Sequence, residues 1–139
     1  MLRWAGMVAV VNLLVACGGS SPSGTDAAAT PCITPTPVTD LSGLPKEFPF
    51  EEWGTVTYLR AQKGFEVVRF VAETTVVELH PEIARTLQDA GYEIVGADNE
   101  GFESEIFFKP GSERTGYFQL REGPCKGQVT TSMIFGRES

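Results

Sequence analysis

Apolar and polar residues alternate with a strand-like period in several short segments after residue 54. Turn-forming residues separate these segments, notably Gly64, Asp98–Gly101 and Lys109–Ser112. Connections this short favour antiparallel neighbours. We therefore expect strands over residues 55–60, 65–72, 92–95, 102–109, 116–121 and 129–135.

One segment in the middle of this series has a helical period instead. Its apolar residues recur at intervals of three and four, and Gly91 follows as a natural C-terminal cap. Pro81 lies inside the pattern, so it either begins the main helix or kinks a longer one. We expect residues 82–90 to be helical, and residues 75–80 as well. The apolar positions are Val76, Leu79, Ile83, Leu87 and Ala90.

The order of elements is then β-β-α-β-β-β-β, which indicates an α+β domain with a single helix packed on a mostly antiparallel sheet. The segment Leu44–Phe50 before the first strand is expected to be irregular, because its two prolines exclude a central strand. The expected core consists of the inward-facing apolar residues Val68, Phe70, Ile83, Leu87, Ile94, Ile106, Phe108, Phe118, Leu120, Val129 and Met133.

A single helix cannot cover such a sheet. Five or six strands make a sheet about 20–25 Å wide, whereas a helix is about 10 Å across. The sheet therefore either curls round the helix or leaves surface exposed. By alternation, the face away from the helix carries Tyr58, Arg60, Arg69, Phe107, Tyr117, Gln119 and Arg121.

Aromatic residues together with arginine are favoured at protein interfaces. Tyr58, Arg60, Phe107, Tyr117 and Arg121 therefore form a candidate interaction face. The alternative is the ordinary polar outer face of an antiparallel sheet.

The start of the chain has a different pattern. A single basic residue, Arg3, precedes an apolar run of about a dozen residues, which stops at Gly18. A transmembrane helix needs about 20 apolar residues. The segment Leu14–Cys17 resembles a bacterial lipobox, and the start of the chain is therefore similar to the signal peptide of a bacterial lipoprotein. Ordinary secretion with a chance cysteine is the alternative.

This resemblance implies a lipid-anchored protein of the cell envelope. Residues 1–16 would be removed, the Cys17 sulfur would carry a diacylglyceryl group, and the new amino end would be acylated, so that the chain reaches its membrane through acyl chains such as palmitate. Two or three such chains anchor a protein stably, whereas one does not. Gly18, in place of an aspartate, favours the outer membrane where there is one.

The composition divides the rest of the chain in two. Residues 17–40 are rich in Gly, Ser, Thr and Pro and are expected to be a disordered tether behind the lipidated cysteine. Residues 41–139 are expected to form the small α+β domain.

The chain is acidic. It has 11 basic and 18 acidic residues and a net charge of −7, and the loss of Arg3 with the signal peptide leaves −8. This balance argues against nucleic acid as a partner and against a flat attachment to anionic lipid. It does not identify the partner, because it also keeps a tethered domain soluble.

Besides Cys17, the chain has only Cys32 and Cys125. An even pair of cysteines in an exported protein predicts a disulfide. This bond would join the end of the tether to the domain and close a loop of about 90 residues. A metal-binding pair and two free thiols are the alternatives, and the presence of only one histidine argues against the metal.

The sequence has no catalytic motif: no nucleophile elbow, no phosphate-binding glycine loop and no HExxH. His80 is either a catalytic base or, as we expect, a residue of the helix start. The acidic residues Asp98, Glu100, Glu103 and Glu105 lack the ligand spacing of an EF-hand loop. We expect them to lie on a solvated hairpin, rather than to form a metal site or a glycosidase carboxylate pair, and we expect neither enzyme activity nor a cofactor.

Three aromatic residues, Phe48, Phe50 and Trp53, precede the first strand. They form either a binding patch or, more commonly for such a lead-in, a cover over the end of the sheet.

Residues 44–135 also resemble, loosely, small uncharacterised bacterial lipoprotein domains, through Leu44–Pro45, Phe48–Pro49, Gly54, Val56 and Leu87–Val95. This resemblance implies no particular activity. The sequence as a whole favours a non-enzymatic binding or interaction module on a lipid tether, with an envelope protein as its partner. The alternative is a carrier that holds a small apolar ligand between the helix and the sheet.

Overall fold

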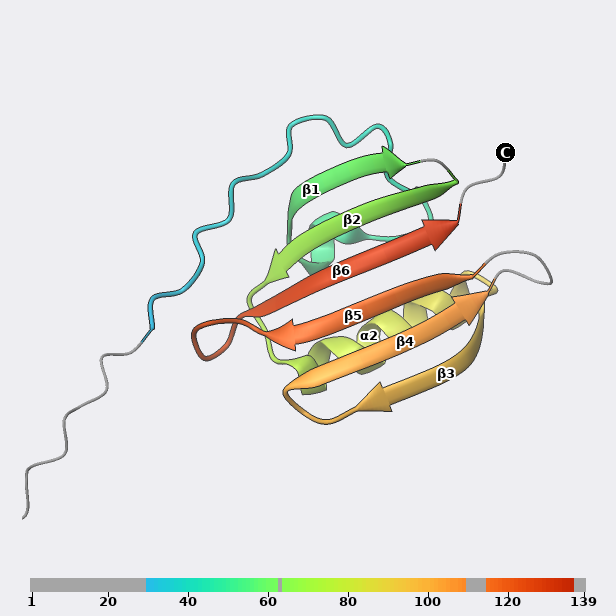
Figure 1. Ribbon diagram of the computed structural model, residues 1–139. Helices are drawn as coiled ribbons and strands as arrows, with labels where there is room; N and C mark the ends of the chain where they lie inside the picture. Colours follow the sequence, from blue (N-terminus) through green and yellow to red (C-terminus); the bar gives the residue numbers. More distant parts are fainter. Residues whose placement is uncertain (1–29, 63, 110–114, 137–139) are drawn as a thin grey trace, which may run out of the picture.

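The computed structural model describes residues 30–62, 64–109 and 115–136, which form a six-stranded antiparallel sheet with helices on one side (Figure 1). The α+β class and the order of the six strands and the main helix are those expected from the sequence, and one further short helix precedes them. The elements are α1 (Phe50–Trp53), β1 (Thr55–Gln62), β2 (Phe65–Ala72), α2 (Val76–Asp89), β3 (Glu93–Asn99), β4 (Glu103–Lys109), β5 (Gly116–Glu122) and β6 (Val129–Gly136).

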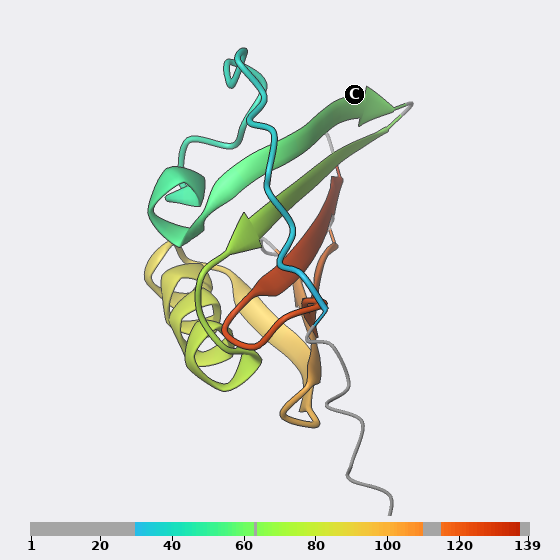
Figure 2. The same cartoon turned by 90° about the vertical axis from the view of Figure 1, so that its left-hand side faces the viewer.

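The strands lie across the sheet in the order β1-β2-β6-β5-β4-β3. β1 and β2 form a hairpin, β3 to β6 follow one another as a meander, and β6 pairs with β2 to join the two parts. α2 packs against β3, β4 and β5, and α1 contacts β1. Both helices lie on the same side of the sheet (Figure 2).

The main helix is the longer of the two forms that the sequence allowed. A capping box begins it: the Glu78 amide donates to the Thr75 hydroxyl at 3.3 Å, and the Thr75 amide donates to the Glu78 carboxylate at 3.3 Å. Pro81 lies inside the helix on an exposed position, and the helix continues through it. The predicted apolar face is buried, except that Ala90 is exposed at the C-cap.

Aromatic residues of the lead-in cover the part of the sheet that α2 does not reach. Phe48, Phe50 and Trp53 are all buried. Trp53 stacks on Phe70 of β2, and Phe48 packs edge-on against Phe135 of β6. These residues therefore belong to the core and do not form a binding patch. Of the expected core residues, all are buried except Ile94, which is half-buried.

The segment before α1 follows the surface of the domain. Cys32 and Cys125 form the predicted disulfide, with their Cα atoms 4.9 Å apart. The amide of Val38 donates to the carbonyl oxygen of Val56 at 2.8 Å, and Val38 and Leu41 pack against the core. Contacts with the domain thus begin at Cys32, before the expected boundary at residue 41.

Candidate functional site

The side of the sheet opposite the two helices carries the residues of the candidate interaction face. We call this side the far face. The strand register places Tyr58 opposite Arg69 and Phe107 opposite Tyr117. Arg121 lies on the same side, opposite Thr130 of β6. The structure therefore brings the five candidate residues, which come from β1, β4 and β5, onto one surface together with Arg69 of β2.

A β-bulge in β1 places Tyr58 and Arg60 on the far face. Val56 is buried on the helix side of the sheet, opposite Phe70. Strict alternation from Val56 would turn Tyr58 and Arg60 to that side as well. The register shifts between Val56 and Tyr58, so that Thr57 is the extra residue and Tyr58 faces outward.

One line of residues across the far face is apolar. Cross-strand pairing aligns one residue from each of β2, β6, β5 and β4, and we call these residues the apolar row: Val67, Ile134, Tyr117 and Phe107. Phe107 is 44% exposed and Ile134 39% exposed. The rings of Phe107 and Tyr117 lie 4.8 Å apart between centroids. Arg60 lies opposite Val67, at the β1 end of the row.

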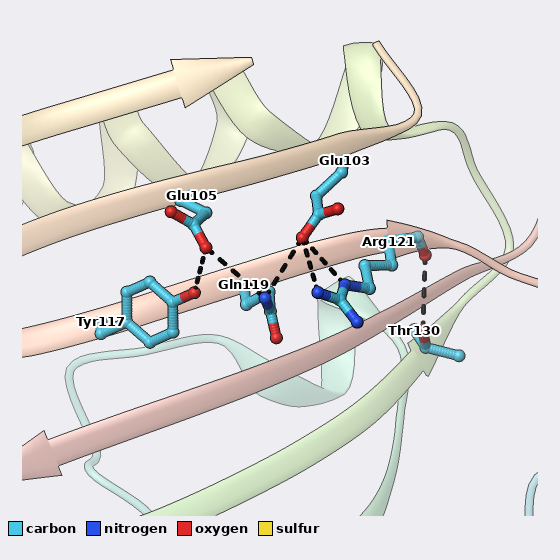
Figure 3. Close-up of polar contacts among 6 residues, drawn as sticks. All are labelled: Glu103, Glu105, Tyr117, Gln119, Arg121 and Thr130. Carbon is cyan, nitrogen blue, oxygen red and sulfur yellow. Dashed lines mark hydrogen bonds and ion pairs between the residues drawn. The ribbon is translucent and has the colours of Figure 1, made fainter. Parts of the chain in front are cut away.

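The rows beside it are polar and are joined by hydrogen bonds between β4 and β5 (Figure 3). The Tyr117 hydroxyl donates to Glu105 at 2.5 Å. Gln119 donates through Nε2 to Glu103 at 3.2 Å and to Glu105 at 3.5 Å. Arg121 donates to the same Glu103 oxygen, through Nε at 2.9 Å and Nη2 at 2.8 Å. This network holds the outward side chains of the two strands in fixed positions.

The ionisation of Tyr117 reflects these surroundings. Burial, together with the hydrogen bond to the negative Glu105 carboxylate, raises the pKa of Tyr117 to about 12. The side chain therefore stays neutral at physiological pH, and its hydroxyl acts as a donor toward Glu105.

His80 lies on the helix side of the sheet, away from the far face. Its Nδ1 forms a hydrogen bond with the Ser104 hydroxyl, which also donates to the Asp98 carbonyl oxygen at 2.9 Å. Burial lowers the pKa of His80. Ser104 is only 2% exposed. The contact thus joins α2 to β4 as a structural link.

The four acidic residues of this stretch line one hollow of about 180 Å³, together with Ser104. Glu103 and Glu105 of β4 face the far side and accept the hydrogen bonds from β5. Asp98 of β3 lies opposite Glu105 and so faces the same side, and both Asp98 and Glu100 are exposed. Within the described parts of the chain, no group of three or more His, Cys, Asp or Glu side chains is placed to hold a metal ion.

Val67 and Ile134 were not among the candidate residues expected from the sequence. The signal was present in the alternation along β6. Because Val129 and Met133 belong to the core, Ile134 must point to the other side of the strand.

The fold and the far face define a small α+β domain with one sheet, covered by helices on one side only. In comparisons with known proteins, no family model matches the chain and no curated protein matches its sequence. Cys17 and the expected signal peptide, residues 1–16, lie outside the described residues. None of the helices in the described part of the chain is long and apolar enough to cross a membrane.

Proposed function

We propose that the protein is a lipid-anchored lipoprotein of the cell envelope, and that its domain binds a protein partner through the apolar row of the far face. The observation that carries this proposal is the line of four outward apolar side chains across neighbouring strands, in a domain that has a complete core of its own.

The make-up of this surface supports a protein as its partner. Aromatic and arginine side chains are enriched at interface centres, and charged or polar side chains form the rim. Here Phe107 and Tyr117 contact each other, and Arg60 stands at one end of the row. Ring contact and the Glu105 hydrogen bond restrict Tyr117 before binding, which reduces the entropy lost when a partner docks.

The anchor rests on the lipobox-like segment Leu14–Cys17. The disulfide between Cys32 and Cys125 is consistent with an oxidising compartment outside the cytoplasm. The acidic net charge of −7 makes a direct attachment of the domain to anionic lipid unfavourable, so the acyl chains would be the membrane contact.

We prefer a protein partner to an apolar ligand carried between α2 and the sheet. That interface is filled by the protein's own side chains: Ile83 and Leu87 of α2 and Phe108 and Phe118 of the sheet are all 0% exposed. A carrier would have to open this packing, whereas the apolar row is already accessible.

Site-specific photo-crosslinking in the native host tests the partner. A photo-reactive amino acid in place of Ile134 is expected to give an adduct with one envelope protein, and the same residue in place of the exposed Glu82 of α2 is expected to give none. Phe107→Ser in the Ile134 probe strain should abolish the adduct. Phe102→Ser, which removes an exposed phenylalanine outside the row, should leave it intact. An adduct that survives Phe107→Ser, or that forms equally from position 82, would refute the proposed surface.

Intact mass spectrometry of the membrane-extracted protein tests the anchor. A chain that begins at Cys17 and carries acyl groups is expected. A chain without acyl groups, or an unchanged membrane fraction in Cys17→Ser, would contradict a lipid anchor while leaving the crosslinking result to stand by itself.

A further inference from the structure

A groove lies at one end of the far face, where the segment Ile33–Thr36 passes beside the strands. Its volume is about 500 Å³, within the range of small-ligand pockets, about 300–1,000 Å³. Ile33, Pro35 and Val71 give it an apolar wall. Its polar lining includes Arg69, Gln119, Arg121, Thr130 and Ser132.

Arg69 brings a positive charge to the groove. Its guanidinium carbon lies 5.1 Å from the centre of the Tyr58 ring, and the side chain is exposed. Among the described residues no carboxylate forms an ion pair with it, whereas Arg121 contacts Glu103 at 2.8 Å. Because arginine stays protonated, a guanidinium without a carboxylate partner among the described residues attracts an anionic group, even though the net charge of the chain is negative.

Hydroxyl groups form the floor between the two arginines. β6 lies between β2 and β5, so that Ser132 is flanked by Arg69 on one side and Gln119 on the other. Thr130 lies opposite Arg121 in the next row. From the strand spacing, the backbones of Arg69 and Arg121 are about 10–12 Å apart. One small ligand can therefore contact both arginine side chains and the hydroxyls between them.

We infer that this groove binds a small sugar acid, with its carboxylate on Arg69 and its hydroxyls on Gln119, Thr130 and Ser132. Guanidinium–carboxylate hydrogen bonds are among the strongest in proteins. Serine and threonine hydroxyls both donate and accept, as sugar hydroxyls do. The C–H face of a sugar ring would pack against the wall at Pro35.

Two features of the groove determine where the carboxylate binds and what keeps the apolar wall in place. Glu103 accompanies Arg121 and repels a second carboxylate, so the anionic group is directed to Arg69. The wall stays in place because the disulfide holds Cys32 and because Gln128 holds Ile33 by two hydrogen bonds. The site is separate from the apolar row and does not depend on the proposed protein partner.

Titration of the full, oxidised, isotope-labelled chain with glucuronate, followed by NMR, tests the inference. Glucuronate is expected to shift the backbone signals of residues 33–36 and 130–132. Glucose, which lacks the carboxylate, and acetate, which lacks the hydroxyls, are expected to bind at least about tenfold more weakly, given the strength of hydrogen bonds to charged groups. A uronate oligomer is the second probe, since the end of an acidic glycan presents the same group.

Arg69→Gln should weaken glucuronate binding about tenfold or more, and Arg69→Lys should restore part of it. Arg85→Gln on the exposed side of α2 is the matched control and should bind as the unchanged chain does. Failure of both glucuronate and the oligomer to shift these signals would overturn the inference. So would equal binding of glucose or acetate, or unchanged binding by Arg69→Gln.

Discussion

Gln128 holds the backbone of Ile33 in both directions: the Ile33 amide donates to Oε1 at 2.8 Å, and Nε2 donates to the Ile33 carbonyl oxygen at 2.9 Å. The two residues are 95 positions apart in the chain. Gln128 is 5% exposed, so its side-chain amide is shielded from water and is hydrogen-bonded to the Ile33 backbone instead. The side chain thus acts as one short piece of strand pairing between the segment at Ile33 and the start of β6.

Removal of the Gln128 side chain is expected to loosen the attachment of the segment at Ile33 to the domain. Gln128→Ala should lower the free energy of unfolding by about 1–3 kcal/mol, because both backbone groups of Ile33 lose their partners. Chemical denaturation measures the loss, and hydrogen exchange at the Ile33 amide should accelerate. Gln88→Ala on the exposed side of α2 is the control and should change little. An unchanged exchange rate at Ile33 in Gln128→Ala would contradict this role.

The disulfide is expected to contribute more. Cys32 and Cys125 are separated by 93 positions, and a bond that closes a loop of this length typically stabilises a small secreted domain by about 2–5 kcal/mol. The double change to serine, made in a Cys17→Ser background, should reduce the free energy of unfolding by this amount. Reduction of the parent chain should have the same effect, and equal denaturation midpoints with and without reductant would rule it out.

Gly116 is expected to be intolerant of any side chain. A Cβ atom at this position would lie 2.1 Å from the ring of Phe108, which is 0% exposed and cannot move outward. Gly116→Ala should therefore destabilise the domain by about 1–3 kcal/mol through overpacking. Gly96→Ala is the matched control, because its Cβ would meet Phe107 at an ordinary 3.7 Å. Equal stability of the two variants in thermal denaturation would show that the Phe108 ring can shift.

The stability of the domain should fall in strong alkali through Tyr117. Burial and the Glu105 hydrogen bond raise the pKa of this tyrosine from 10.0 to about 12. Because the folded pKa is higher than the unfolded one, the contribution is complete below pH 10 and is lost as the pH rises toward 12. Ultraviolet titration, with Tyr117→Phe subtracted, measures the pKa. Glu105→Gln should lower it, and an unchanged value would remove Glu105 as a cause.

Protonation of His80 should lower the stability of the domain in acid, whereas ionisation of Tyr117 lowers it in alkali. Burial lowers its pKa from 6.5, so the folded state favours the neutral ring. Its contribution to stability is present above pH 6.5 and is lost as the pH falls through the lowered pKa. NMR titration of the single histidine measures this value directly. The stability difference between the parent and His80→Gln should shrink in acid, and a difference independent of pH would show that protonation of His80 is not linked to folding.

Periodicity predicted those helices and strands that have one side buried along their whole length. The apolar spacing of Val76, Leu79, Ile83 and Leu87 identified the buried face of α2, and alternation identified most inward residues of β2, β4, β5 and β6. These patterns can be read from the sequence because one side of each element is buried throughout its length.

The features that the sequence did not reveal depend on contacts between distant residues. α1 has only four residues, too few for a period, and its buried Phe50 and Trp53 are explained by their packing on Phe70. The bulges at Thr57 and near Val95 interrupt alternation, and only the partner strands define them. The groove likewise depends on Ile33 reaching Gln128, which no local pattern indicates.

The bond between Cys32 and Cys125 also determines how the domain bears mechanical force. Tension applied from the N-terminal side reaches Cys32 and passes through the disulfide to the turn between β5 and β6. The chain between the two cysteines, which contains the lead-in, α1, α2 and strands β1 to β5, is outside this load path. About 300–330 Å of extended chain is therefore protected from stretching as long as the bond is oxidised, and reduction would turn a short, stiff attachment into a long, extensible one.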